Sequence, residues 1–193
     1  MLKQPEGDDR LTADCRGEEL LKIARNCLLE LFDLPVEPSV EGPWLREDGA
    51  CFVTLRRGAE LRGCIGTILP HRPLIEDLKA NTLAAATRDP RFPPLAREEL
   101  DLTTIQVALL SPLEHMDVDS EADLLQQLRP GIDGLVLEFG PHRGTFLPSV
   151  WKELPDPARF VGQLKRKAGL GTEFWSPESR IRRYSTQSWS EAG

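Results

Sequence analysis

Two short segments rich in apolar and β-branched residues constrain the fold most. Residues 51–57 read CFVTLRR and residues 61–68 read LRGCIGTI, and a short gap containing Gly58 separates them. Two such runs joined by a short gap with glycine are typical of a β-hairpin. The sequence therefore predicts a hairpin around which the rest of the chain is organised.

The second arm of this hairpin carries the residues best suited to chemistry. Residues two apart on a strand share a face, so Arg62 and Cys64 are expected to place a guanidinium beside a thiol. A nearby cation lowers the pKa of a thiol. Gly63 and Gly66 are expected to leave the backbone thinly covered, so that a ligand can approach. The alternative is that Cys64 is a small buried hydrophobe and that Gly63 marks a bulge.

The rest of the chain predicts further helices and strands. They are helices at 18–32, at 74–88 and from Ser120, and strands at 103–111, 135–139, 143–147 and 180–184, the last at a sheet edge. The alanine-rich helix at 74–88 is expected to lie against the first hairpin. Mixed strands and helices with two hairpins indicate an α+β fold, with packed helices and an antiparallel or mixed sheet.

Length and composition predict one folded domain with loose ends. A chain of 193 residues with 40% hydrophobic content is large enough to bury its own core. We expect residues 1–13 to be a flexible leader, residues 14–189 to form a single domain and residues 190–193 to be a frayed tail.

Charge and cysteine usage argue against several classes of partner. The net charge of −7 makes the average surface repel nucleic acids and anionic membranes. The four cysteines show no CxxC spacing and no signal-peptide pattern begins the chain, which indicates a reducing compartment. No apolar run approaches the roughly 18 residues that a membrane span needs. We therefore expect a cytoplasmic protein without membrane or nucleic-acid partners.

Metal and cofactor motifs are missing from the sequence. The histidines at 71, 115 and 142 are scattered without HxH or HxxxH spacing, and there is no phosphate-binding loop or dinucleotide fingerprint. We predict no metal site and no cofactor, and a dyad of Cys64 with one of these histidines is disfavoured. Basic residues remain as a possible anion or RNA site, although solvated surface charge is favoured. They are Lys165, Arg166, Lys167, Arg180, Arg182 and Arg183.

Four separated motifs resemble one known family, in the same order along the chain. The motifs are LRGCIGT at 61–67, AAATRDPRF at 84–92, GLVL at 134–137 with RGTFLPSVW at 143–151, and FVGQLKRKAGL at 160–170. This arrangement is similar to the AMMECR family, whose bacterial members are often called AmmeMemoRadiSam system protein A. The resemblance covers roughly residues 16–189 and implies a structure with a larger and a smaller lobe.

The resemblance names no reaction and leaves two hypotheses open. In the first, the chain is an enzyme or enzyme component, with Cys64 as its reactive thiol. Its ligand-binding residues are then Arg62, Gly63, Gly66, Asp89, Arg91 and Thr145. Bacterial relatives occur beside Memo-like and radical SAM proteins, which are the partners that the resemblance implies.

In the second hypothesis, the same groove is a non-catalytic module that recognises a peptide or a small anion, and Cys64 merely packs. A reactive thiolate titrates below the usual thiol pKa of about 8.5, whereas a packing cysteine resists alkylation. Both hypotheses predict that residues 89–92 and 144–148 converge on the strand that carries Cys64.

Overall fold

The computed structural model describes residues 6–38 and 42–192, and the side chains of residues 15–38 and 42–192. The chain forms a larger unit, Met1–Leu110 with Gln187–Gly193, and a smaller unit, Ser111–Thr186. Each unit has an antiparallel sheet and its own cluster of buried apolar side chains. The α+β class is therefore confirmed. None of the described helices is long and apolar enough to cross a membrane.

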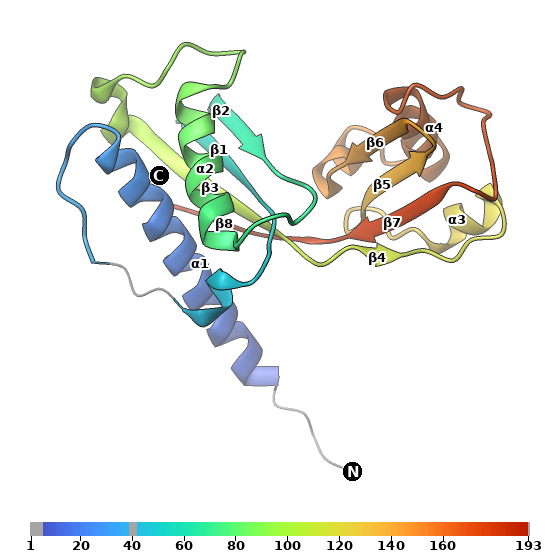
Figure 1. Cartoon of the computed structure of the whole chain (residues 1–193), viewed down its shortest axis with the longest axis horizontal. Coiled ribbons are helices and arrows are strands. Elements are labelled where there is room, and N and C mark those ends of the chain that lie inside the picture. The colour runs from blue at the N-terminus through green and yellow to red at the C-terminus, as the bar shows by residue number, and fades with distance from the viewer. Residues whose placement is uncertain (1–5, 39–41, 193) are drawn as a thin grey trace. The chain divides into compact units, whose positions relative to one another are not determined.

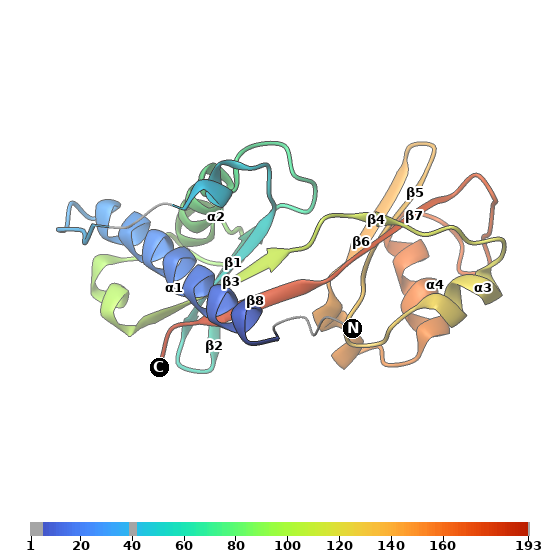
Figure 2. The same cartoon turned by 90° about the horizontal axis from the view of Figure 1, so that it is seen from below.

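The larger unit is built on the predicted hairpin. Its sheet has the order β2-β1-β3-β8, formed by β1 (Cys51–Arg57), β2 (Glu60–Gly66), β3 (Thr103–Leu110) and β8 (Thr186–Ser190). Buried and half-buried residues alternate along β1 and along most of β3, so that one face of the sheet is covered. The cover comes from α1 (Glu6–Glu30) and α2 (Leu74–Thr87), which pack against each other (Figures 1 and 2).

Close packing of α2 on the hairpin depends on small residues. Ala85 and Ala86 are buried on α2. A Cβ atom at Gly63 of β2 would lie 2.1 Å from the carbonyl oxygen of Ala85, far inside van der Waals contact. Only glycine fits at this position, and the predicted contact between this helix and the hairpin is confirmed.

A buried carboxylate ties the start of β1 to α2. Asp77 is fully buried and accepts hydrogen bonds from four neighbours. The donors are the Cys51 backbone N–H (3.0 Å), the Thr67 hydroxyl (2.7 Å), the Asn81 amide (2.9 Å) and the Arg72 guanidinium (2.7 Å). Burial, and next the charge of Asp77, raise the pKa of the Cys51 thiol. Cys51 is therefore a packing cysteine.

The smaller unit is built on the second predicted hairpin. Its sheet has the order β4-β7-β5-β6, formed by β4 (Glu114–His115), β7 (Arg180–Tyr184), β5 (Gly134–Phe139) and β6 (His142–Phe146). The helices are α3 (Glu121–Gln127) and α4 (Pro157–Lys167), and α4 packs on β6. The rings of Trp151 and Phe160 stack at 3.9 Å in the core of this unit.

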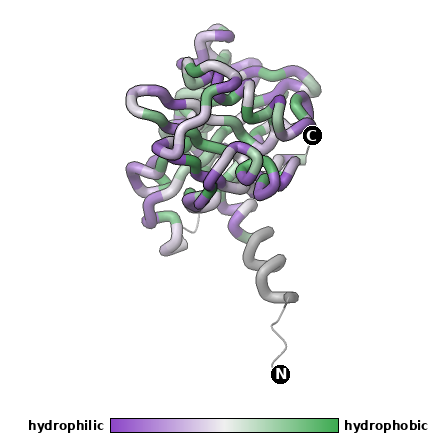
Figure 3. Tube along the Cα trace, turned by 90° about the vertical axis from the view of Figure 1, so that its right-hand side faces the viewer, coloured by the Kyte–Doolittle hydropathy of each residue, from purple (hydrophilic) through white to green (hydrophobic). Residues whose placement is uncertain are grey.

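Short 3-10 helices complete the described elements: η1 (Pro43–Arg46), η2 (Arg97–Leu102) and η3 (Pro148–Lys152). Ser120 caps α3 by accepting a hydrogen bond from the Asp123 backbone N–H, as the capping pattern predicts. Figure 3 shows hydrophobic and hydrophilic segments alternating along the trace, with the outer loops mainly hydrophilic.

The ends of the domain differ from the predictions. Helix α1 begins at Glu6, so that much of the predicted leader is helical. β7 is not an edge strand, because it pairs with β5 on one side and β4 on the other. The predicted frayed tail does not hold at Glu191, whose carboxylate accepts hydrogen bonds from the Arg25 guanidinium and the Ile105 backbone N–H. These contacts join both ends of the larger unit to its sheet.

One of the basic residues considered as an anion or RNA site, Lys165, is not a surface charge. Lys165 is 1% exposed, forms an ion pair with Glu121 at 2.7 Å and donates to the Thr172 carbonyl at 3.0 Å. Its charge is therefore neutralised inside the smaller unit.

Candidate functional site

A β-bulge interrupts the strand that carries Cys64. In the ladder between β1 and β2, Leu55 lies opposite Gly63 and Arg56 lies opposite Leu61, so Arg62 is the extra residue. The bulge that the sequence offers as an alternative is thus present, beside Gly63. Because the bulge breaks the regular alternation, spacing alone does not place Arg62 and Cys64 on one face.

Arg62 connects β2 to residues 93–99 by hydrogen bonds within the larger unit. Its side chain is buried, and its guanidinium donates to the Glu99 carboxylate at 2.9 and 2.8 Å. It also donates to the carbonyl oxygens of Pro93 (2.9 Å) and Pro94 (3.1 Å). The hydrogen bonds from Arg62 lower the pKa of Glu99 to about 2. These contacts engage Nε and both terminal nitrogens within the protein, and ligand binding by Arg62 stays a prediction.

The guanidinium that reaches the Cys64 strand belongs to Arg91. The buried carboxylate of Asp89 accepts from the Cys64 backbone N–H at 2.8 Å, and from Arg91 Nε at 2.9 Å and Nη2 at 2.7 Å. Arg91 Nη2 also donates to the Cys64 carbonyl oxygen at 3.3 Å. The hydrogen bonds from Arg91 hold the pKa of Asp89 far below its usual range. The predicted convergence of residues 89–92 on this strand is therefore confirmed.

Arg91 is both fixed and accessible. Its guanidinium lies 5.5 Å from the centre of the Phe92 ring, and 53% of its side chain is exposed. Asp89 and the Cys64 carbonyl engage Nε and Nη2, and the guanidinium also interacts with the Cys64 side chain. Arg91 is therefore held in place while about half of its side chain stays exposed.

The thiol of Cys64 has a hydroxyl as its neighbour. Cys64 is partly buried, and the Thr54 hydroxyl on β1 donates to its sulfur at 3.3 Å. No histidine among the described residues forms a hydrogen bond with this thiol. Cys27 is buried, and burial raises the pKa of its thiol to about 11. Cys15 is exposed, so exposure alone does not single out Cys64.

Gly63 and Gly66 of β2 are closely packed against other parts of the protein. Gly63 makes room for the backbone of α2 at Ala85 on the side where a Cβ atom would project. A Cβ atom at Gly66 would lie 2.2 Å from the ring of Phe52, which covers that side of the strand. Both glycines therefore have packing roles, and ligand contacts to them stay predictions.

Thr145 belongs to the smaller unit. Its hydroxyl lies 3.4 Å from the Tyr184 hydroxyl, and its carbonyl accepts a hydrogen bond from Lys167 at 3.0 Å. The neighbouring Phe146 packs on Phe160, as expected of a core residue. A common site of Thr145 with Cys64 stays a prediction, as does a concave pocket beside Cys64.

Sequence reasoning missed two residues of this region. Thr54 lies opposite Cys64 in the ladder, and Glu99 is the partner of Arg62. The hairpin pattern points to a partner near Thr54, but the bulge shifts the register and hides the exact pairing. No sequence signal singled out Glu99.

Comparison with known proteins assigns the family. The sequence model of the AMMECR1 family matches residues 21–189. A protein of Methanothermobacter thermautotrophicus is 40% identical over 186 residues, which cover 92% of this chain and 95% of that protein. Protein MJ0810 of Methanocaldococcus jannaschii is 40% identical over 149 residues, covering 75% of this chain and 74% of that protein. The crystal structure of uncharacterized protein PH0010 from Pyrococcus horikoshii superposes with a TM-score of 0.76 at 32% identity, covering 91% of each chain. The chain therefore belongs to the AMMECR1 family.

Proposed function

We propose that this protein binds an anionic group of a small molecule or peptide at the Arg91 surface, which we define as Thr54, Cys64, Asp89, Arg91 and Phe92. One observation supports this most. The strand with Cys64 and the turn with Arg91 are distant in sequence but hydrogen-bonded through Asp89, and together they present an exposed, fixed guanidinium. Fixing the side chain in advance lowers the entropy cost of binding.

The local charge balance also favours an anion. Asp89 neutralises one positive charge, but it is buried beneath Arg91 and its oxygens are already occupied by donors. Arg88 is exposed next to it and has no side-chain partner among the described residues. The exposed part of this turn therefore carries a surplus of guanidinium donors, which are well suited to carboxylates and phosphates.

Recognition fits the thiol environment better than covalent catalysis does. A cysteine nucleophile usually has a base or a strong cation close to its sulfur. The hydrogen-bond donor to the Cys64 sulfur is the Thr54 hydroxyl, which is not a base at neutral pH. The Arg91 guanidinium also interacts with the Cys64 side chain, but its charge is already paired with the Asp89 carboxylate. We therefore assign Cys64 to the wall of the binding surface.

An enzyme is the second candidate, because Cys64 is only partly buried and the Arg91 guanidinium contacts its backbone and interacts with its side chain. We further propose that the ligand is shared with Memo-like and radical SAM partners. This part of the proposal is supported by the resemblance of the chain to the AmmeMemoRadiSam proteins.

Metabolite and peptide capture with matched variants tests the proposal. The purified full chain is incubated with the small-molecule and peptide fractions of a cell extract, and retained compounds are identified by mass spectrometry. The variants are Arg91→Ala, Cys64→Ser and the control Arg97→Ala, which removes an exposed arginine whose side chain has no partner among the described residues.

We expect an anionic compound to be retained by the wild type, Cys64→Ser and Arg97→Ala, and lost by Arg91→Ala. A compound that becomes covalently attached to Cys64 and is lost in Cys64→Ser would instead establish the enzyme hypothesis. Retention of the same compounds by wild type and Arg91→Ala would refute binding at the Arg91 surface.

A further inference from the structure

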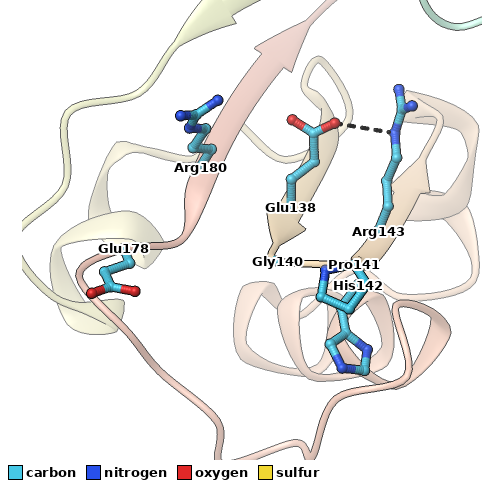
Figure 4. Close-up of a pocket in the computed structure, with 7 residues that line it drawn as sticks. All are labelled: Glu138, Gly140, Pro141, His142, Arg143, Glu178 and Arg180. Carbon is cyan, nitrogen blue, oxygen red and sulfur yellow. Dashed lines mark ion pairs between the residues drawn. The ribbon is translucent and has the colours of Figure 1, made fainter.

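A second group of charged residues lies at one end of the sheet in the smaller unit, and it is independent of the Arg91 surface. It lines an open cavity of about 610 Å³ (Figure 4). The lining residues are Glu138, Gly140, Pro141, His142, Arg143, Glu178 and Arg180. This volume lies within the range of about 300–1,000 Å³ that is common for small-molecule sites.

The strand register places three of these residues in one row. Glu138 on β5 lies opposite Arg180 on β7 and opposite Arg143 on β6. Residues directly opposite each other on antiparallel strands project from the same face of the sheet. Figure 4 shows their side chains on adjacent strands, with Glu138 between the two arginines.

Glu138 pairs with one arginine of this row and not with the other. Its Oε1 atom pairs with Arg143 at 3.3 Å, and its Oε2 atom pairs with Arg182, which lies outside the row, at 2.7 Å. Each carboxylate oxygen therefore already has a guanidinium partner. Arg180 is exposed and has no side-chain partner in the described part of the chain.

An unpaired carboxylate lines the same cavity. The Glu178 side chain is exposed and has no partner among the described residues. Its backbone N–H donates to the Ser176 hydroxyl at 3.2 Å, which fixes the turn before β7. The cavity thus presents one free guanidinium and one free carboxylate, within the described part of the chain, that do not form an ion pair with each other.

We propose that this cavity binds a small zwitterion that carries one carboxylate and one ammonium group, such as an amino acid or a short peptide. The ligand carboxylate pairs with Arg180, where the guanidinium fork matches its two oxygens. The ligand ammonium pairs with Glu178. A ligand with both charges satisfies both unpaired groups, whereas a simple anion would leave Glu178 unpaired and repelled.

Two probes that differ in one charge test this inference by nuclear magnetic resonance. Glycylglycine carries a carboxylate and an ammonium group, whereas N-acetylglycine keeps the carboxylate alone. Each is titrated into the isotope-labelled full chain, and the backbone amides of Glu138–Arg143 and Glu178–Arg180 are followed. The variants are Arg180→Ala, Glu178→Gln and Arg159→Ala, the last removing an exposed arginine of α4 as a control.

We expect glycylglycine to cause saturable shifts at these amides and to bind more tightly than N-acetylglycine. Loss of one charge-assisted contact is worth about a factor of ten or more, so Arg180→Ala should weaken glycylglycine binding at least about tenfold. Glu178→Gln should weaken glycylglycine binding and leave N-acetylglycine binding unchanged. Arg159→Ala should bind as the wild type does.

Three results would overturn the proposal: no saturable shift with glycylglycine, equal affinity of the wild type for both probes, or unchanged glycylglycine affinity in Arg180→Ala. Equal affinity would indicate a site for anions alone. Because Arg180 and Glu178 are exposed, both variants should fold, and a thermal unfolding curve of each variant verifies this. None of these substitutions touches the Arg91 surface, so this test and the capture test fail independently.

Discussion

Replacing Asp89 by asparagine tests whether one carboxylate holds the Arg91 turn on the Cys64 strand. The substitution keeps the size of the side chain and one oxygen acceptor, but removes the negative charge. The remaining oxygen can accept from the Cys64 backbone N–H or from Arg91, which now share a single acceptor. The new amide donors face a guanidinium that has no lone pair to accept them.

The expected loss of stability follows from these contacts. Hydrogen bonds to a charged group contribute about 1.5–3 kcal/mol each. Arg91 is half exposed, so water replaces much of what its guanidinium loses, and exposed ion pairs are worth about 1 kcal/mol or less. We therefore expect the opening free energy of the larger unit to fall by about 2 kcal/mol at pH 7.

The Asp89 carboxylate also predicts how the difference in opening free energy between wild type and Asp89→Asn depends on pH. The folded-state pKa of Asp89 is lowered by Arg91, so the folded form binds this proton less readily than the unfolded form. The stabilisation is therefore fully present above the unfolded pKa of about 3.9 and is lost as the pH falls toward the folded pKa. Below about pH 4, the difference between wild type and Asp89→Asn should shrink by about 1.4 kcal/mol per pH unit.

Hydrogen–deuterium exchange at the β1 and β2 amides, measured from pH 3 to pH 7, reports this opening free energy. Asp101→Asn is the matched control, because Asp101 is exposed and has no side-chain partner in the described part of the chain. Equal opening free energies of wild type and Asp89→Asn at pH 7 would refute the reasoning. A difference that stays constant down to pH 3 would show that the charge of Asp89 is not its source.

Two further predictions concern the packing of the Cys64 strand. Gly63→Ala should lower the free energy of unfolding by about 2 kcal/mol or more in urea denaturation, because its Cβ would collide with the Ala85 carbonyl. The control Gly171→Ala should have little effect, because a Cβ atom there would have no heavy atom within 4 Å. Iodoacetamide should label Cys64 well before Cys27 in the folded protein at pH 7, because Cys27 is buried and burial raises the pKa of its thiol to about 11. Mass spectrometry maps the labelled cysteines over time. Labelling of Cys27 before Cys64 would contradict the burial of Cys27.

Local sequence patterns predicted the elements well because those patterns depend on near neighbours. Alternation in residues 51–57, helical spacing in residues 74–88 and the capping serine at 120 each correspond to an observed element. The start of α1 was harder to find, because its first turns are polar and resemble a loose leader. The order of the four motifs along the chain also indicated the family, because each motif is a short run of neighbouring residues.

Contacts between distant segments were decided by the tertiary structure. Sequence spacing pointed to Arg62 as the cation beside Cys64, but the bulge and the Glu99 ion pair assign that guanidinium to the core. Arg91 takes the place next to the strand because Asp89 binds both the guanidinium and the Cys64 backbone.

The sequence by itself determined the α+β class and the two hairpins. The tertiary structure alone decided which arginine is buried and which is exposed, and that Gly63 admits a helix backbone. The physical reason is that a strand or helix period is a property of neighbouring residues. An arginine's partners and a glycine's neighbour are set by segments that fold against it from elsewhere in the chain.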